Sequence, residues 1–362
     1  MNKQLIIFNP SIEDGGVEKN LFLITNHFAK KKLKITIISA DINKKIEFNK
    51  NVNFIYPKKI NFKKSGRIKK YFFCLLLLIK EIFKRKEVVV FSFQANIYSL
   101  VICLLFKKKI IVRLNTAPQG WDHNLLKSKI YKFFIKKADG VIVNSNKFKI
   151  EVKKRYNINS ICILNPFDFN KILKFANKKV PQFFPKNCLK IINIGRMTIQ
   201  KDQILLLKAI NLIKDIMNIY LIIIGKGREY DQLNKFIKEH NLKNNVKLLG
   251  YKKNPFPYIK HSDIFVLSSK YEGSPNVLVE ALILKKLIIS TDCPTGPKEI
   301  LNNGKYGQLV KIGDFKAITK AILNYKKSDY FKKKINNGYR SLKIYSHKRN
   351  TKKYFNLIYK YL

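Results

Sequence analysis

Short apolar runs alternate with longer amphipathic stretches along the first half of the chain. The runs are rich in isoleucine, valine and phenylalanine and are bounded by polar residues or glycine, as is typical of strands. The stretch from about Val17 to Lys31 has the length and apolar period of a helix. Strands are expected at Gln4–Phe8, Lys34–Ala40, Val88–Phe93, Ile110–Leu114, Gly140–Val143 and Ser160–Leu164. Strands that alternate with helices of this length predict βαβ units and a parallel sheet.

The alternation breaks where Pro166, Pro181 and Pro185 occur and then resumes. A second series of strands is expected at Lys190–Ile194, Ile219–Ile224, Val246–Leu249, Ile264–Ser268 and Leu287–Ser290. The pattern predicts an α/β protein with two doubly wound, Rossmann-like parallel-sheet domains. We expect them at residues 1–170 and 188–340, joined by a linker at 171–187, with an amphipathic helix over 341–362 returning to the first domain. Because open sheets bind ligands at the carboxyl ends of their strands, a central cleft is the expected site.

The composition of the chain says more about its binding partners than about its fold. The chain has 362 residues, of which 46% are hydrophobic, so packed cores are expected rather than disorder. The formal net charge is +50 and uneven: residues 51–200 carry +26, but residues 201–300 carry only +6. A block this basic favours an anionic partner, either nucleic acid or an acidic membrane leaflet, although codon bias towards lysine explains part of the count.

The basic run from Lys58 to Lys86 is interleaved with aromatic residues, which favours the anionic leaflet over a merely solvated face. No recognised nucleic-acid-binding motif is present, so no nucleic-acid partner is expected. The five scattered cysteines predict buried thiols in a reducing compartment. Val88–Phe106 is long enough to span a bilayer, but polar residues at its middle favour a strand, a loop and a helix. We expect a cytoplasmic protein, peripheral on the inner face of the membrane.

The second half carries charged residues where its strands end. Arg196 and Lys201 follow the first strand of this half, and Glu272 lies in a loop before a helix that carries Glu280. A departing diphosphate needs cations and backbone donors, because negative charge grows on it as its bond breaks. The two cations and the N–H groups of the opening helix meet that need.

The two glutamates would be repelled by a diphosphate, so we expect them to contact the hydroxyl groups of a sugar or ribose. The apolar neighbours of Glu280 predict its burial. The chain contains no Asp-x-Asp pair that could chelate a metal, so we expect metal independence and no cofactor. Gly225 and Gly227 lack the third glycine of a dinucleotide fingerprint.

These residues carry a family resemblance. The string from Asn193 to Arg196 with Lys201, followed by Glu272-Gly-Ser-Pro-Asn-Val-Leu-Val-Glu280, resembles the signature of the GT-B retaining glycosyltransferases of family 4. The resemblance implies a hexosyltransferase that moves a hexose or N-acetylhexosamine from a nucleotide diphosphate sugar with retention of configuration. The attack would be front-face, and the leaving phosphate would take the acceptor's proton.

The segment 290–301 resembles the branch of this family that builds polysaccharide and lipid-linked oligosaccharide chains from UDP-sugars. The implied acceptor is a membrane lipid-linked glycan held by the first domain; a soluble acceptor is the alternative. Recovery of the protein entirely in a low-salt supernatant would favour that alternative.

The resemblance also implies roles for single residues. Arg196 and Lys201 would bind the donor diphosphate, Glu272 would contact the transferred sugar, and Glu280 would contact the ribose. Further donor contacts are implied for Gly16, Gly195, Gly225, Gly250, Tyr251, Asn276 and Val277. Many relatives carry a histidine just after the strand that ends here at Leu114, and this chain does not. We expect Asn115 to form hydrogen bonds in its place, in preference to His123.

Overall fold

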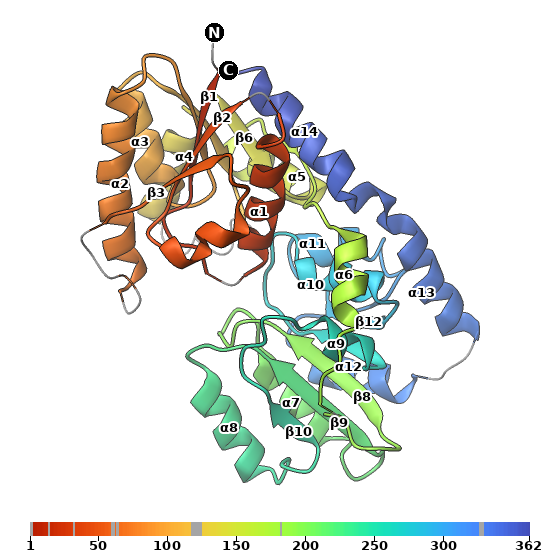
Figure 1. Cartoon of the computed structure of the whole chain (residues 1–362). Coiled ribbons are helices and arrows are strands. Elements are labelled where there is room, and N and C mark those ends of the chain that lie inside the picture. The colour runs from red at the N-terminus through yellow and green to blue at the C-terminus, as the bar shows by residue number, and fades with distance from the viewer. Residues whose placement is uncertain are drawn as a thin grey trace. The chain divides into compact units, whose positions relative to one another are not determined.

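The computed structural model describes residues 3–362 except 14, 32, 59–61, 63–64, 117–124, 182 and 326–328. The chain divides into two compact units, Met1–Phe167 with Tyr345–Leu362, and Asp168–Ile344. Each unit is built on a parallel sheet flanked by helices (Figure 1). The predicted α/β class with two doubly wound parallel sheets is therefore confirmed.

The first unit contains a seven-stranded sheet. Its strands are β1 (Gln4–Phe8), β2 (Lys34–Ile38), β3 (Val52–Ile55), β4 (Val89–Ser92), β5 (Lys109–Arg113), β6 (Gly140–Val143) and β7 (Ile161–Cys162). Its helices are α1 (Gly16–Phe28), α2 (Arg67–Phe83), α3 (Asn96–Leu105), α4 (Leu125–Ile135), α5 (Asn146–Tyr156) and α14 (His347–Tyr359), with a short 3-10 helix η1 (Ile42–Glu47). The strand order is β3-β2-β1-β4-β5-β6-β7.

Both faces of this sheet are buried, as the apolar runs predict. Because side chains alternate along a strand, Leu5 and Ile7 of β1 enter one apolar cluster and Ile6 and Phe8 enter the other. The cluster with Leu5 and Ile7 packs against α1 and α14, while the other packs against α2, α3 and α5. Helix α14 also contacts α1, so the last residues of the chain complete the first unit.

The second unit contains a six-stranded sheet of order β10-β9-β8-β11-β12-β13. Its strands are β8 (Leu189–Ile194), β9 (Ile219–Ile224), β10 (Val246–Leu248), β11 (Ile264–Leu267), β12 (Leu287–Thr291) and β13 (Gln308–Val310). Its helices are α6 (Phe169–Ala176), α7 (Gln203–Asn211), α8 (Tyr230–Glu239), α9 (Phe256–Lys260), α10 (Asn276–Ile283), α11 (Gly296–Ile300), α12 (Phe315–Leu323) and α13 (Asp329–Ser341).

Two predicted segments differ from the structure. The predicted linker 171–187 contains most of helix α6, because Ile172 and Ala176 give it an apolar face that packs against α9 and α10. The predicted single helix over 341–362 is instead the end of α13, a 3-10 turn η3 (Leu342–Tyr345) and helix α14. Tyr345 and Phe167 are joined by a backbone hydrogen bond at this point, where the chain re-enters the first unit.

The apolar stretch Val88–Phe106 folds as the sequence predicts. It forms strand β4, a short loop and helix α3, and Ser92 and Ser99 from its middle hydrogen bond to each other at 2.9 Å. Across the described residues, no helix combines the length and apolar character that a bilayer crossing requires.

Candidate active site

The carboxyl edge of the second sheet gathers the charged residues singled out from the sequence. Strands β9, β8, β11 and β12 are neighbours in the sheet, so the loops that follow them meet at one edge. Three hydrogen bonds of 2.8 Å join the loops after β8 and β11. They run from Lys270 N–H to Gln200 O, from Gln200 Nε2 to Tyr271 O, and from Ser268 Oγ to Lys201 O. These bonds hold the two loops in a fixed register.

Lys201 and Glu272 form an ion pair at this edge. The Nζ atom of Lys201 lies 2.5 Å from Oε1 of Glu272, and their side chains are 15% and 8% exposed. Ser269 Oγ donates a hydrogen bond to the same carboxylate oxygen at 2.7 Å. A partly buried charge pair interacts more strongly than one in water, so this cluster is well defined before any ligand arrives.

The backbone of Glu272 is held by the loop after β12. Its N–H donates to Pro294 O, and the N–H of Thr295 donates to Glu272 O at 2.9 Å. The Thr295 hydroxyl donates to Gly273 O at 2.9 Å. The loop after the neighbouring strand β12 therefore fixes the backbone of Glu272, so that only its side-chain torsions can vary.

Glycines allow the neighbouring loops to approach. A Cβ atom on Gly225 would lie 1.8 Å from Gly195 O, so no side chain fits there. The Lys201 side chain crosses Gly195, where a Cβ atom would lie 3.3 Å from Lys201 Cδ. Gly225 therefore has a packing reason to be glycine, independent of any ligand, whereas at Gly195 the contact is with a flexible side chain.

Arg196 contrasts with Lys201. Its side chain is exposed, and within the described part of the chain it has no acidic partner. Its own carbonyl accepts a hydrogen bond of 3.1 Å from Gln203 Nε2, which anchors the backbone at this point. The guanidinium is therefore available to an anion at the sheet edge.

The remaining predicted residues of this unit lie on the same edge or just behind it. Glu280, on the second turn of α10, is 1% exposed, which confirms its predicted burial. Gly250 adopts φ +66°, a conformation that favours glycine, and its carbonyl accepts from the Gly225 N–H. Tyr251 is exposed, with the Nζ atom of Lys226 5.4 Å from the centre of its ring. Asn276 and Val277 are the first two residues of α10.

Cys293 lies close to the Lys201–Glu272 ion pair, and its thiol is unreactive. Burial, and secondarily the charge of Glu272, raise the pKa of its thiol to about 12, so it stays neutral at physiological pH. Within the described ranges, no three His, Cys, Asp or Glu side chains gather into a possible metal site.

Known protein families match both units. The chain matches the model described as Glycosyl transferases group 1 over residues 174–341, and the model described as Glycosyltransferase Family 4 over residues 14–170. It is also 35% identical over 277 residues to an uncharacterized glycosyltransferase of Methanocaldococcus jannaschii, covering 68% of each chain. The chain belongs to the family 4 glycosyltransferases.

Other relatives and solved structures extend the match over nearly the whole glycosyltransferase. An N-acetylgalactosaminyltransferase of Campylobacter jejuni, named for a glycan on PP-undecaprenol, is 26% identical over 345 residues, or 91% of this chain and 90% of its own. HepE of Anabaena, solved with UDP and glucose, superposes with a TM-score of 0.80 at 15% identity, over 99% of this chain and 100% of its own. Staphylococcus aureus TarM, solved with UDP, gives 0.77 at 15% identity over 98% and 99%. The structural matches establish the GT-B fold.

The first unit of the glycosyltransferase presents neutral polar groups at its carboxyl edge. Asn115 follows β5, and its Nδ2 donates to Phe93 O at 2.7 Å. Among the described residues, its Oδ1 is buried and has no hydrogen-bond partner, and the same holds for Asn9 Oδ1, Ser11 Oγ and Asn144 Oδ1. Buried polar atoms without a partner are uncommon, and these four follow strands β1, β5 and β6 at the carboxyl edge of the sheet.

Two predicted residues of the first unit remain to be placed. Gly16 is the first residue of helix α1. His123 lies outside the described residues.

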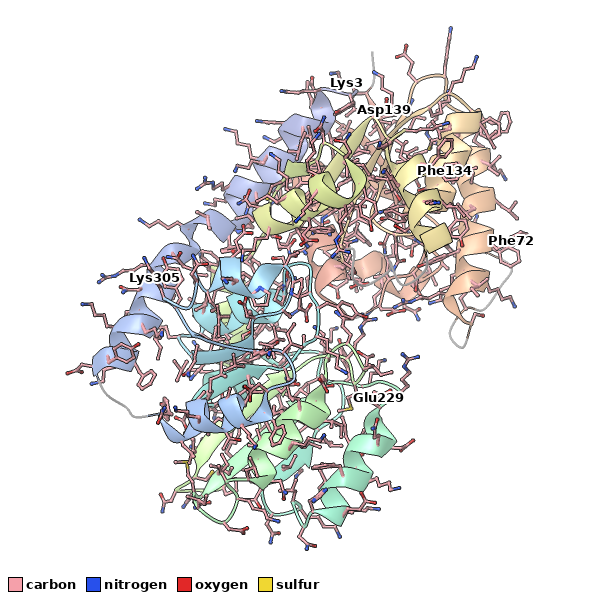
Figure 2. All side chains as sticks on the ribbon, turned by 180° about the vertical axis from the view of Figure 1, so that it is seen from behind. Lys3, Phe72, Phe134, Asp139, Glu229 and Lys305 are labelled. Carbon is pink, nitrogen blue, oxygen red and sulfur yellow. The ribbon has the colours of Figure 1, made fainter. Side chains whose placement is uncertain are left out.

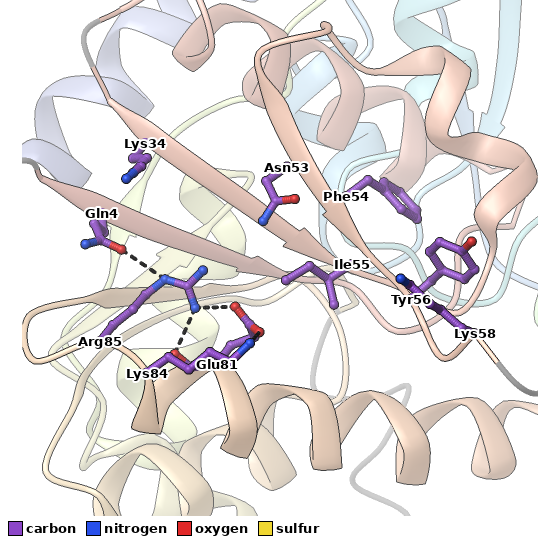
Figure 3. A pocket seen from close by; sticks show the side chains of 10 residues that line it. All are labelled: Gln4, Lys34, Asn53, Phe54, Ile55, Tyr56, Lys58, Glu81, Lys84 and Arg85. Atoms are coloured by element: carbon purple, nitrogen blue, oxygen red, sulfur yellow. Dashed lines mark hydrogen bonds and ion pairs between the residues drawn. The ribbon is translucent and has the colours of Figure 1, made fainter.

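A polar pocket in the first unit lies between strands β1–β3 and the end of α2 (Figure 3). Arg85 donates to Gln4 Oε1 at 2.9 Å and to the Glu81 carboxylate, and Lys84 pairs with Glu81 at 3.2 Å. Although burial raises the pKa of Glu81, hydrogen bonds from Arg85 and Lys84 lower it below its usual value. These contacts fix α2 to the sheet, and we assign no ligand to the pocket.

Sequence reasoning missed the residues that position Glu272. Ser269 is fully buried and bonds its carboxylate, while Thr291 Oγ1 donates to Ser269 O at 2.6 Å. The N–H of Thr295 donates a hydrogen bond to the backbone carbonyl of Glu272. Serine and threonine near strand ends are too common to single out from a sequence, so only the three-dimensional contacts reveal them.

Proposed function

We propose that this glycosyltransferase moves a sugar from a UDP-sugar to a lipid-linked glycan with retention of anomeric configuration. The observation that carries the proposal is the Lys201–Glu272 ion pair, 2.5 Å long, beside the exposed Arg196 at the carboxyl edge of the second sheet. Cations and a carboxylate at one edge suit a ligand that is anionic at one end and rich in hydroxyls at the other.

Arg196 and Lys201 would bind the donor diphosphate. As the bond from the sugar C1 atom to the diphosphate oxygen breaks, negative charge grows on that oxygen, and nearby cations lower the barrier. The acceptor oxygen bonds to C1 on the same face, and its proton passes to the departing diphosphate oxygen. The helix dipole and first N–H groups of α10, at Asn276 and Val277, would add to this stabilisation.

Glu272 would orient the transferred sugar. Among the described residues, both side-chain interactions of its carboxylate use Oε1, which accepts from Lys201 and Ser269. The other oxygen, Oε2, is left to accept a hydrogen bond from a sugar hydroxyl. Ser269 then acts as a positioning residue, because it fixes which carboxylate oxygen points to the ligand.

Tyr251 with Lys226, and the buried Glu280, would contact the nucleoside. An exposed aromatic ring with a cation nearby is a suitable surface for a planar base. A carboxylate is a suitable acceptor for ribose hydroxyls. UDP is the preferred nucleotide because HepE and TarM, which share the fold, were solved with it.

The acceptor would be a glycan on a lipid carrier at the inner face of the cytoplasmic membrane. Two Campylobacter jejuni relatives, 27% and 26% identical, carry names that specify PP-undecaprenol or diphospho-undecaprenol glycans. The neutral amides and hydroxyls of Asn9, Ser11, Asn115 and Asn144 in the first unit are suited to sugar hydroxyls. We further propose that no metal is required, because Arg196 and Lys201 would supply two cations to the diphosphate.

The test begins with donor binding. Purified full-length protein is heated with a panel of nucleotide sugars, and the true donor should raise the melting temperature by mass action. The best donor is then assayed for transfer to a polyprenyl-diphosphate-linked sugar, and the anomer of the product is determined by NMR. No stabilisation by any nucleotide sugar, or an inverted product, would contradict the proposal.

Two controls sharpen this test. Lys270→Ala removes an exposed lysine from the loop that holds Glu272 and should leave donor binding unchanged, whereas Lys201→Ala should weaken it strongly. Transfer should also continue in excess EDTA. Loss of activity in EDTA that Mg²⁺ restores would show that a metal takes part.

A further inference from the structure

The outer face of helix α2 carries an apolar stripe. Ile68, Phe72, Leu76 and Phe83 are 86%, 58%, 48% and 70% exposed. Their spacing of four, four and seven residues places them on one side of the helix. Phe72 projects away from the ribbon in Figure 2. An amphipathic helix of a water-soluble surface would carry polar residues at these positions, so the stripe calls for a partner.

Helices α3 and α4 extend this apolar surface. Helix α2 contacts α3, and α3 contacts α4, side by side on one flank of the first unit (Figure 1). Tyr98 and Leu105 on α3, and Ile130 and Phe133 on α4, are also exposed. We call the exposed residues of these three helices the α2–α4 face. Eight large apolar side chains are thus exposed on three helices that contact one another in turn, which exceeds the single exposed side chains expected on any protein surface.

Contacts at both ends of α2 keep the stripe facing outwards. Arg67 pairs with Glu13 at 2.6 Å, and Lys70 pairs with Asp41 at 2.6 Å. Just after the other end of the helix, Arg85 pairs with Glu81 and donates to Gln4 Oε1 of β1 at 2.9 Å. Because both ends are tied to the sheet and its loops, rotation of the helix to bury the stripe would break these pairs.

Exposed lysines are interspersed with the apolar residues of this face. They are Lys69, Lys80, Lys107, Lys129, Lys136 and Lys137. None of the six has an acidic partner among the described residues, and Lys137 Nζ lies 4.3 Å from the centre of the Phe133 ring. Against them stand only three described acidic residues between 65 and 139, namely Glu81, Glu87 and Asp139, and Glu81 is already paired. The face is therefore both apolar and strongly cationic.

We propose that the α2–α4 face docks on an anionic lipid leaflet, with Phe72 and its neighbours inserted at the boundary of headgroups and acyl chains. Aromatic and aliphatic side chains ringed by lysines match the two components of such a surface. This inference rests on the proposed function in one respect, since the lipid-linked acceptor would be presented there. A second copy of the chain fits less well, because a twofold interface would bring the lysines of one copy against those of the other.

The experiment measures binding of the full-length protein to vesicles by sedimentation. Vesicles of phosphatidylcholine are compared with vesicles that also contain phosphatidylglycerol. We expect binding to the anionic vesicles, and a loss of at least about tenfold for Phe72→Glu, because an inserted aromatic side chain is replaced by a charge that the lipids repel. Ile216→Glu changes an apolar residue of the second unit that is even more exposed, at 71%, and should leave binding unchanged.

A second variant separates charge from insertion. Lys69→Gln combined with Lys80→Gln should weaken binding to anionic vesicles severalfold and reduce its dependence on salt. Failure of the unaltered protein to bind anionic vesicles, or equal binding by Phe72→Glu, overturns the proposal. So does a dimer, detected by light scattering, that Phe72→Glu dissociates while vesicles remain unbound.

Donor binding distinguishes this inference from the proposed function. Phe72→Glu should keep the thermal stabilisation by the nucleotide sugar, since the substitution lies in the other unit from Arg196 and Lys201. If the unaltered protein binds the donor but does not bind anionic vesicles, the docking face alone is refuted. Absence of any donor binding would refute the proposed function, whatever the vesicles show.

Discussion

The two units share a frame but carry their charges in different places. Strand order runs the same way in both sheets, β3-β2-β1-β4-β5-β6 in one and β10-β9-β8-β11-β12-β13 in the other. The carboxyl edge of the second sheet holds Arg196 and the Lys201–Glu272 pair. The corresponding edge of the first sheet offers amides and hydroxyls, such as those of Asn115 and Ser11, and the buried Arg113 there donates to Tyr354 Oη and Asn165 Oδ1. The exposed lysines described above lie on helices α2 and α4 or just after α3 and α4.

Under the proposed function, this difference would let one fold serve two kinds of ligand. The sheet fixes where loops meet, and the loop residues decide whether that place suits an anion or a neutral, hydroxyl-rich molecule. A diphosphate needs fixed cations, while glycan hydroxyls can also be bound by neutral amides and hydroxyls. The comparison predicts that substitutions at the two edges will affect donor and acceptor separately.

The largest effect is expected from Glu272. Glu272→Ala should lower kcat on the order of 10³-fold, because it removes the group that orients the sugar in the transition state. The substitution also leaves Lys201 without its partner in a partly buried position, so a lower melting temperature is expected. Glu272→Gln keeps the shape and serves as the control for folding. Near-normal turnover by the alanine variant, measured with the same donor, would remove Glu272 from the site.

Alanine variants of Arg196 and Lys201 should lose catalytic efficiency to a similar extent but differ in their stability to urea. Either alanine variant should lower kcat/KM on the order of 10²-fold, as when a charge-stabilising donor is lost. Arg196→Ala should leave the urea midpoint unchanged, since its side chain is exposed and has no acidic partner in the described structure. Lys201→Ala should lower it, because Glu272 is left buried and uncompensated. Equal midpoints for the two variants would mean that the ion pair contributes nothing to folding.

Asn115 tests the neutral edge of the first sheet. Asn115→Ala should raise the KM for the acceptor by up to about tenfold, the scale of one lost hydrogen bond. The KM for the donor should not change, because Arg196, Lys201 and Glu272 lie in the second unit. Its amide also bonds Phe93 O, so some loss of stability is expected and the ratio of the two KM values is the decisive measurement. A parallel rise in both would contradict the division of roles.

Most of the strands could be predicted from the sequence, including the edge strands β7 and β10, but two other edge strands could not. The bounds of β1, β6 and β9 match the prediction, because continuous apolar runs identify strands buried on both faces. Strands β3 and β13 were missed. Each lies at the edge of its sheet, and β3 alternates buried Val52 with exposed Asn53, which weakens the apolar signal. Helix α6 was missed because prolines that follow it mark the whole segment as a linker.

The residue types of the site could be predicted, but not their contacts. Arg196, Lys201 and Glu272 stand out because charged residues directly follow apolar strands. Their pairing is a different matter, since Lys201 and Glu272 are separated by 71 positions and meet only because β8 and β11 are neighbours. The role of Ser269 likewise depends on the side chain that it faces.

Residues at the amino edge of the second sheet should contribute to stability and not to donor binding. Lys286 tests this expectation. Its Nζ atom donates to the carbonyls of Lys260 and Ser262, at 2.5 and 2.7 Å. Burial lowers the pKa of Lys286 from its usual 10.5 to about 8, with the nearby Asp263 opposing the change. Between these values the unfolded chain holds more protons than the folded one, so the free energy of unfolding rises with pH through this window.

Lys286→Met lacks this titration and should lack the rise. Urea unfolding of both proteins from about pH 7.5 to 10.5 gives the difference directly, and the other lysines and the tyrosines cancel because both proteins contain them. We expect the unaltered protein to gain stability relative to the variant as pH increases, with donor affinity equal in the two at neutral pH. Parallel stability curves would mean that the folded protein leaves the pKa of Lys286 at its ordinary value. A change in donor affinity would show that the amino edge is coupled to the site, against the separation of roles drawn from the two sheets.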